Sequence, residues 1–350
     1  MDQKFEALFD GGVDAYIIFD ENTRRYFTGF DSSFGCVVLT ADKQYFITDS
    51  RYKLAAERAC GDKFDVTIVE KAALYDAIAR MTAPCRTAGV LEDKISASEY
   101  KNIKKQLQKL TLKNACEKLY GHMAIKSADE IRAVTASQRL NESALDATLK
   151  QFRVKDTERE FRAEYIYQVY KQGGDGLAFE PVVAFGRNAA KPHHHAEDKK
   201  AERGDFLLVD CGCRLAGYCS DMTRVFCFSE PSVKMLELYK TVLGAQQYAI
   251  ANIGPGMTCH EADSLAREFI ISNGCGDEFT HGSGHGVGVN IHEAPSLKRD
   301  SPDVLRPNMV VTIEPGIYIE DIGGVRLEDM LVITENGAEN ITKFRKTYRI

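Results

Sequence analysis

Four acidic residues stand within or directly after apolar, strand-like runs of this chain, and they limit what its sheets can be. Asp210 follows "FLLV", and Asp221 lies within "YCSDMTRVF". Glu314 ends "MVVTI", and Glu328 interrupts "GVRLEDMLVIT". Strand interiors normally exclude Asp and Glu, and burying an unpaired carboxylate costs several kcal/mol. We therefore expect these charges to share a partner.

The first two acids are expected to meet in a hairpin. If "RLAG" (214–217) closes it with Arg214 opposite Gly217, Asp210 lies directly across from Asp221. Like charges that face each other on a sheet are destabilising, and a bound cation would remove the repulsion. Any one such acid is more often a hydrogen-bonded or edge-strand carboxylate, so the argument depends on all four together.

A glycine-rich stretch, "HGSGHGVGVNIHE" at residues 281–293, contains three histidines. One imidazole with four carboxylates would make a donor set suited to two divalent ions, because four negative charges balance two doubly charged cations. A bridging hydroxide would be the one extra anion. Oxygen donors with a single imidazole favour a hard metal such as manganese, with cobalt or zinc as alternatives.

Clustered cysteines offer a competing zinc-thiolate site. Cys211 and Cys213 have the opposite strand parity to Asp210, whereas Cys219 shares a face with Asp221. Thiols on different faces do not converge easily on one ion, so we favour the carboxylate site. The ten cysteines of a chain this long are expected to remain reduced.

The two halves of the chain differ in pattern. About the first 110 residues alternate strand-like and helix-like segments, which predicts an α/β unit. Later, capping-box signatures at 127–130, 157–160 and 258–261 predict three helix starts, and Gly173-Gly174 ends the second helix. Short loops between the strand candidates favour an antiparallel sheet and an α+β domain. These candidates are residues 180–186, 205–212, 218–228, 309–319 and 324–334.

Composition argues against two classes of partner. Lys plus Arg total 45 and Asp plus Glu total 51, which gives a net charge of −6, and no basic stripe is present for phosphate contacts. Nucleic acid is therefore not expected. No run approaches the roughly 18 apolar residues of a spanning helix, and the opening stretch 1–14 mixes acids and bases. We expect a cytoplasmic protein without a membrane partner.

Taken in order, the runs "DCGCRLAGYCSDMTRVF", "HGSGHGVGVNIHE", "TIEPGIY" and "GVRLED" resemble the motif set of the pita-bread dinuclear metallopeptidases. Within them the chain looks most like the proline-specific branch, the Xaa-Pro dipeptidases (prolidases) and aminopeptidases P. The resemblance implies a creatinase-like N-terminal α/β domain at residues 1–118. It implies an α+β pita-bread catalytic domain at residues 119–350, with an antiparallel or mixed sheet and covering helices.

The resemblance also assigns metal ligands. Carried over residue by residue, the five ligands fall on Asp210, Asp221, His285, Glu314 and Glu328. Asp221 and Glu328 would touch both ions.

Other histidines resemble substrate-side residues of the family. His281 and His292 match positions that hydrogen-bond the scissile carbonyl, the developing oxyanion or the product-side group. His193, within "KPHHH", matches the family's other substrate-facing histidine. His194 and His195 are expected to be loop residues.

The expected reaction is metal-dependent hydrolysis of the bond between an N-terminal residue and proline, with a hydroxide held by two ions as the nucleophile. Glu314 is the candidate to carry the proton to the leaving nitrogen, and His292 and His193 are expected to stabilise the tetrahedral intermediate. Arg326 shares a strand face with Glu328 and is expected to steady that carboxylate or bind substrate. Tyr318 is expected to line the cleft.

Two other functions stay open. A methionine-type aminopeptidase shares the five ligands but commonly lacks an N-terminal domain of this size. A non-catalytic peptide- or protein-binding module on the same fold need not keep ligands, whereas all five positions are filled here. Chain length favours a dipeptidase over an aminopeptidase P. The resemblance implies proline-containing peptides as substrates and a homodimer.

Overall fold

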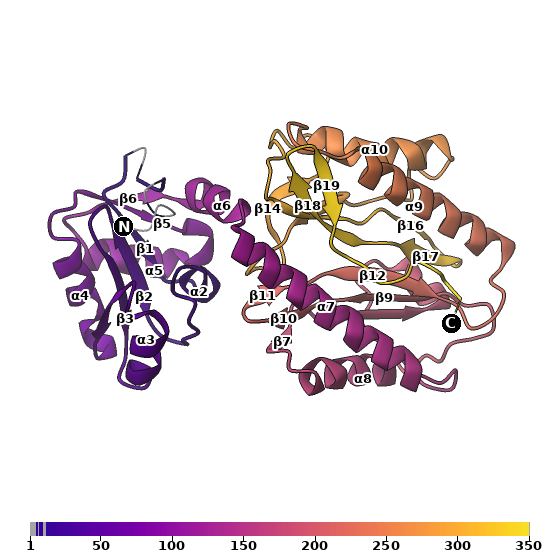
Figure 1. Ribbon diagram of the computed structural model, residues 1–350, viewed down its shortest axis with the longest axis horizontal. Helices are drawn as coiled ribbons and strands as arrows, with labels where there is room; N and C mark the ends of the chain where they lie inside the picture. The colour runs from indigo at the N-terminus through magenta and orange to yellow at the C-terminus, as the bar shows by residue number, and fades with distance from the viewer. Residues whose placement is uncertain (1–4, 6, 10–11, 350) are drawn as a thin grey trace. The chain divides into compact units, whose positions relative to one another are not determined.

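The computed structural model describes residues 5, 7–9 and 12–349, so part of the mixed-charge opening stretch lies outside the described residues. The chain divides into two compact units, Met1–His122 and Met123–Ile350 (Figure 1). The boundary expected after residue 118 falls inside helix α6 (Cys116–Ala124). Among the described helices, none is long and apolar enough to cross a membrane.

The first unit is built on a six-stranded mixed sheet with the order β4-β3-β2-β1-β5-β6. Alternate strand residues such as Ile17, Val38 and Val90 enter a core to which α4 and α5 contribute Ile78 and Ile103. The α/β pattern expected from the sequence is confirmed. Its elements are β1 (Ala15–Ile18), α2 (Glu21–Thr28), β2 (Cys36–Thr40), β3 (Gln44–Thr48), α3 (Lys53–Cys60), β4 (Asp65–Ile68), η1 (Lys71–Ala73), α4 (Leu74–Met81), β5 (Thr87–Val90), η2 (Glu92–Lys94), α5 (Ala97–Gln106) and β6 (Thr111–Asn114).

The second unit places its sheets between two pairs of helices (Figure 1). Helices α7 and α8 pack on strands β8, β9 and β12, as Phe161 and Val209 illustrate. Helices α9 and α10 pack on the other sheets through residues such as Val242 and Ile313. The helices are α7 (Ala128–Gln151), α8 (Glu158–Lys171), η3 (Gly186–Ala190), α9 (Val233–Asn252) and α10 (Cys259–Ser272).

The named strands of this unit pair antiparallel, as the short loops predict. They form four small sheets with the orders β11-β10-β7, β12-β9-β8, β14-β13-β15-β18-β19 and β16-β17. Their bounds are β7 (Gly176–Leu177), β8 (Val182–Phe185), β9 (Leu207–Cys211), β10 (Cys213–Leu215), β11 (Tyr218–Cys219), β12 (Met222–Phe226), β13 (Gly284–Gly286), β14 (Glu293–Leu297), β15 (Val310–Ile313), β16 (Gly316–Ile319), β17 (Gly323–Arg326), β18 (Asp329–Thr334) and β19 (Gly337–Asn340).

The three predicted capping boxes are confirmed. The side chains of Ser127, Thr157 and Thr258 each accept a hydrogen bond from the backbone N–H of the glutamate three residues later. The carboxylate of that glutamate in turn accepts a hydrogen bond from the backbone N–H of the cap residue. Helix α8 then ends at Lys171, just before Gly173 with a φ of 92°. The Gly-Gly stop is therefore confirmed as well.

The hairpin after β9 has a different register from the expected one. Arg214 pairs with Cys219, so Ala216 and Gly217 form the two-residue loop. Both loop residues have positive φ, 48° and 80°, as the favoured type of two-residue hairpin loop requires. Glycine adopts this conformation easily, which places Gly217 in the loop rather than in the strand.

The two aspartates are consequently offset along the sheet. Asp210 faces Thr223 across β9 and β12, so the prediction that it lies directly across from Asp221 is wrong. Asp221 lies in the gap between β11 and β12. A Cβ at Gly212 would meet the Ser220 carbonyl oxygen at 2.2 Å, so the backbones approach closely beside this gap.

Three expected strands are each divided in two at an acid. Asp221 separates β11 from β12, Glu314 separates β15 from β16, and Glu328 separates β17 from β18. In each case the two halves belong to different sheets. Asp210 lies within β9 itself. Asp221, Glu314 and Glu328 therefore mark points where the chain passes from one sheet to another.

Candidate metal centre

The five predicted ligands line one cleft of about 830 Å³ in the second unit. Asp221, His285 and Glu328 offer ligand atoms that lie within 4.8 Å of one another. His285 Nε2 lies 3.3 Å from Glu314 Oε1 and 3.5 Å from Asp221 Oδ2. The sheet junctions thus bring together residues that are far apart in the sequence.

His285 is held on β13 by its glycine neighbours and by Thr312. A Cβ at Gly284 would meet the Thr312 carbonyl oxygen at 2.0 Å, and one at Gly286 would meet the Ala294 carbonyl oxygen at 2.2 Å. The His285 backbone N–H donates to Thr312 Oγ1 at 3.0 Å, and its Nδ1 lies 3.0 Å from the Gly286 carbonyl oxygen. With Nδ1–H donating there, Nε2 keeps its lone pair toward the carboxylates, as a metal ligand requires.

The carboxylates repel one another in a buried setting. Asp221 is 4% exposed and Glu328 is 1% exposed. Burial raises the pKa of both groups well above the usual range, and the neighbouring carboxylates raise it further. Burial also raises the pKa of Glu314 and lowers the pKa of His285. A cation among these groups would favour ionised carboxylates, against the effect of burial, and it would keep the imidazole neutral, in line with the effect of burial.

Asp210 shows most directly that this donor set fits a cation. Its Oδ2 accepts a hydrogen bond from Arg326 Nη2 at 2.6 Å. Its Oδ1 is buried and has no hydrogen-bond partner among the described residues. Leaving a buried oxygen without a donor costs about 1–3 kcal/mol. The guanidinium supplies one positive charge against four carboxylates, and oxygen-rich sets of this kind suit divalent ions.

Arg326, a predicted substrate-side residue, lies among the carboxylates and is 4% exposed. It donates to Asp210, to the Tyr318 hydroxyl at 2.6 Å and to Thr223 Oγ1 at 3.1 Å. Thr223 in turn donates to Glu328 Oε2 at 2.8 Å. Arg326 therefore steadies Asp210 directly, and it reaches Glu328 through Thr223.

The other predicted histidines line the same cleft. His193 and His292 are exposed, and the His292 ring lies edge-on to that of His285 with 4.4 Å between centroids. His281 Nε2 lies 2.9 Å from the hydroxyl of Tyr318, which is 8% exposed. The pKa of His281 and of His292 is lowered, mainly because neighbouring groups displace water from the imidazoles, so both are neutral near pH 7.

Sequence reasoning missed two threonines that orient the ligands. Thr312 Oγ1 donates to Glu314 Oε1 at 3.2 Å, and Thr223 holds Glu328. Thr312 lies two residues before Glu314, and Thr223 lies two residues after Asp221. Residues two apart in an extended chain share a face, so this spacing was a usable signal.

The clustered cysteines do not converge on an ion in the described part of the chain. The candidate metal-binding groups found there contain no cysteine, and all ten thiols are free. Cys211 Sγ donates to Asn141 Oδ1 at 3.3 Å, and Cys213 Sγ lies 3.3 Å from Ser220 Oγ. The structure therefore favours the carboxylate site over the zinc-thiolate alternative.

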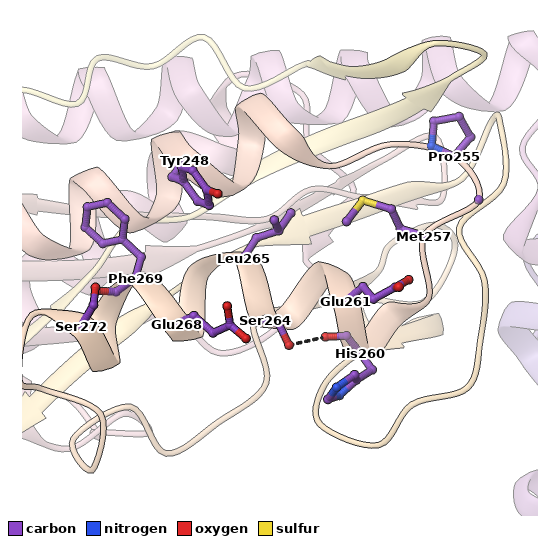
Figure 2. A pocket seen from close by; sticks show the side chains of 11 residues that line it. Tyr248, Pro255, Met257, His260, Glu261, Ser264, Leu265, Glu268, Phe269 and Ser272 are labelled. Carbon is purple, nitrogen blue, oxygen red and sulfur yellow. Dashed lines mark hydrogen bonds between the residues drawn. The ribbon is translucent and has the colours of Figure 1, made fainter.

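A second hollow, of about 900 Å³, lies along α9 and α10 (Figure 2). Glu261, one of the two acidic residues that line it, accepts hydrogen bonds from the Thr258 backbone N–H and hydroxyl, both at 2.8 Å, as part of the helix cap. The His260 carbonyl accepts the Ser264 hydroxyl, and His260 Nδ1 accepts the Asp300 backbone N–H at 3.3 Å. Because these polar groups have partners within the fold, we place the function in the cleft.

Comparison with known proteins identifies the family. The model of metallopeptidase family M24 matches residues 132–335, which include the residues lining the cleft. The chain belongs to metallopeptidase family M24. The model of the creatinase/prolidase N-terminal domain matches residues 5–121. The expected pita-bread fold with a creatinase-like N-terminal domain is thereby confirmed.

Similarity to members of this family extends over nearly the whole chain. An Xaa-Pro dipeptidase of Pyrococcus furiosus is 34% identical over 349 residues, which are 98% of each chain. The structure of an Xaa-Pro dipeptidase from Bacillus anthracis matches with a TM-score of 0.93 at 34% identity, covering 99% of this chain and 98% of that one. An X-Pro aminopeptidase from Thermotoga maritima matches with a TM-score of 0.90 at 33% identity, covering 97% and 98%.

Proposed function

We propose that this protein is a metal-dependent Xaa-Pro dipeptidase, which hydrolyses the bond between an N-terminal residue and proline. The observation that carries the proposal is the cleft, where four carboxylates and one imidazole converge without enough protein cations to balance them. Similarity to Xaa-Pro dipeptidases over nearly the whole chain supports the substrate class.

The proposed metal ligands are Asp210, Asp221, His285, Glu314 and Glu328, and the proposed cofactor is a pair of divalent ions. Such ions supply a water molecule activated for attack and a Lewis acid that polarises the substrate carbonyl. The excess of oxygen donors over a single imidazole favours manganese, and cobalt and zinc are the alternatives to test.

Protein groups around the ligands would complete the chemistry. Glu314 would move a proton from the attacking water to the proline nitrogen, and Thr312 fixes the orientation of this carboxylate. His292 and His193 lie at exposed positions of the cleft, from which they would donate hydrogen bonds to the developing oxyanion. His281, oriented by Tyr318, would bind the substrate.

Selectivity for proline would come from the shape of the cleft. A bond to the proline nitrogen has no N–H to recognise, and the ring has a fixed geometry. We propose dipeptides as the principal substrates. A homodimer and a cytoplasmic location, both expected from the sequence, remain predictions.

The test is hydrolysis by the purified full chain loaded with Mn(II). We expect release of the N-terminal amino acid from Xaa-Pro dipeptides at least about tenfold faster than from tripeptides with the same first two residues. Faster cleavage of the tripeptides would replace the dipeptidase assignment with an aminopeptidase. Peptides that begin Met-Ala serve as the control, because their cleavage without Xaa-Pro cleavage would favour a methionine-type aminopeptidase. Cleavage of none of these peptides would overturn a catalytic role.

A further inference from the structure

The triple histidine at residues 193–195 has an anchor that sequence reasoning did not reveal. His193 and His195 are exposed, whereas His194 between them is 5% exposed. His194 Nε2 lies 2.8 Å from Oε2 of Glu158, a fully buried residue at the start of α8. Two exposed imidazoles therefore flank a buried, hydrogen-bonded one.

Glu158 accepts hydrogen bonds from four groups along the segment 185–197. Its Oε1 accepts the Phe185 backbone N–H at 2.8 Å and the Asn188 side-chain amide at 2.9 Å. Its Oε2 accepts from His194 and from the Glu197 backbone N–H, both at 2.8 Å. The helix dipole also favours a carboxylate in the first turn of α8. This one buried group thus fixes the course of the whole segment.

These contacts argue against a second metal site at this place. Glu158, His194 and Glu197 offer ligand atoms within 4.8 Å of one another. A carboxylate has about four lone-pair positions, and four donors already occupy those of Glu158. Glu197 is exposed. The cluster holds the chain in place and needs no ion to balance it.

The anchored segment carries a residue of the cleft. His193, directly before His194, lines the cleft with the predicted metal ligands. We propose that His194 and Glu158 are positioning residues for His193: the buried pair pins the middle imidazole and thereby holds His193 toward the substrate. This inference rests on the proposed function, in which His193 stabilises the oxyanion.

The first test measures the kinetics of the metal-loaded full chain on an Xaa-Pro dipeptide. His194→Ala is expected to lower kcat by about 10- to 100-fold with KM nearly unchanged, because misplacing an oxyanion donor weakens the transition state most. His194→Gln, whose amide can still donate to Glu158, should recover most of kcat. His195→Ala is the matched control and should leave kcat unchanged. An equal loss in His195→Ala, or no loss in His194→Ala, would overturn the proposal.

The second test asks whether His194 acts through His193. In a His193→Ala background, adding His194→Ala should cause little further loss of kcat, because the group that it positions is already gone. Losses that multiply in the double variant would show that His194 acts independently.

The third test needs no activity. Exposed Arg187 lies within the anchored segment and exposed Lys200 lies just after it, and both are trypsin sites. His194→Ala should speed their cleavage in the metal-free protein, whereas His195→Ala should not. Unchanged cleavage in His194→Ala would disprove the anchor. If the wild-type chain cleaves no Xaa-Pro peptide, the proposed function and the catalytic role of His193 fail, while proteolysis still decides whether the segment is anchored.

Discussion

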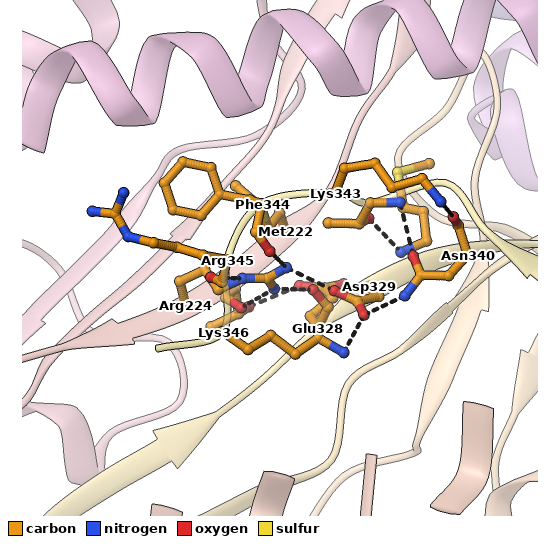
Figure 3. Close-up of polar contacts among 12 residues, drawn as sticks. Met222, Arg224, Glu328, Asp329, Asn340, Lys343, Phe344, Arg345 and Lys346 are labelled. Carbon is orange, nitrogen blue, oxygen red and sulfur yellow. Dashed lines mark hydrogen bonds and ion pairs between the residues drawn. The ribbon is translucent and has the colours of Figure 1, made fainter. Parts of the chain in front are cut away.

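Two clusters of buried charge lie next to each other in the second unit, and they balance that charge in different ways. In the first, Arg224 Nη2 donates to Asp329 Oδ1 at 2.8 Å and Lys346 Nζ lies 2.5 Å from Asp329 Oδ2 (Figure 3). In the second, the cleft, the carboxylates greatly outnumber the guanidinium of Arg326, and Asp210 keeps an oxygen without a donor among the described residues.

The two clusters use consecutive residues of the same strand segments. Thr223 bonds Glu328 in the cleft, and the next residues along, Arg224 and Asp329, bond each other. Successive side chains of an extended chain point to opposite faces, which separates the two clusters. Arg224 also donates to the Glu328 carbonyl oxygen at 2.7 Å and to the Phe344 carbonyl oxygen at 2.9 Å. The balanced cluster, formed by Arg224 and Asp329, therefore stabilises the junction between β17 and β18. This junction carries Glu328, a predicted metal ligand of the unbalanced cluster in the cleft.

Burial of charge is common to both clusters, so burial alone does not mark a functional site. Arg224 is 1% exposed and Asp329 is fully buried, yet each has a partner of opposite charge. Asp221 and Glu328 are equally buried beside other carboxylates, and their pKa values rise as a result. Buried charge that the protein itself leaves unbalanced is the feature that indicates a bound cation.

The largest effect is expected from removing a ligand of the unbalanced cluster. Asp221→Asn or Glu328→Gln should lower kcat/KM by about 10⁴-fold, which is about 5.4 kcal/mol, and should reduce the bound metal. The metal-free variant should be at least as stable as the metal-free wild type, because one buried like charge is gone. Elemental analysis and thermal unfolding measure both results. Full metal content with full activity would contradict the assignment.

The balanced cluster should respond in the opposite way. Arg224→Met is expected to lower the free energy of unfolding by about 3–5 kcal/mol, with or without metal, because it leaves the Asp329 carboxylate buried with less compensation. Urea unfolding measures the loss. The double variant Arg224→Met with Asp329→Leu should lose less than the sum of the two single changes. A loss that depends on the metal would mean that the clusters are not separate.

A histidine of the cleft should affect catalysis without affecting metal binding. His292→Ala is expected to lower kcat by about 10²-fold, about 2.7 kcal/mol, through loss of an oxyanion donor. The control is metal content, which should match that of the wild type because His285 keeps its ligand position. Loss of metal in His292→Ala would mean that His292 is itself a metal ligand, and the predicted set of five ligands would have to be revised.

The smallest effect concerns pH. Because the pKa values of Asp221 and Glu328 are raised, these groups hold protons in the metal-free protein to higher pH than usual, and a metal must displace them. Affinity for Mn(II) should therefore increase as the pH rises through the raised pKa values of these groups. Calorimetry in two buffers should also record proton release on binding. Affinity that is independent of pH would contradict the proton competition.

Much of this molecule could be predicted from local patterns. A misplaced acid, a Ser-x-x-Glu cap and an apolar run each extend over a few residues, so Asp210, Glu314 and the starts of α7 and α8 can be recognised without a structure. The register of the hairpin could not be predicted in this way, because moving its two-residue loop by one position along the chain changes which residues of the two strands face each other. The positive φ of Ala216 and Gly217 decides that choice.

The remaining features depend on contacts that are distant in the sequence. Asp221 and Glu328 stand inside strand-like runs of sequence, so the sequence suggests continuous strands where the chain in fact changes sheets. The anchor of His194 on Glu158 joins residues 36 positions apart, and no local spacing indicates it.

The central claim is that the carboxylates of the cleft share divalent ions. Anomalous diffraction from crystals of the Mn(II)-loaded protein tests it most directly. We predict two manganese peaks between Asp210, Asp221, Glu314 and Glu328, with His285 bound to one of them. Acidic side chains that surround no ion, or a peak beside Glu158 and His194 instead, would contradict the account.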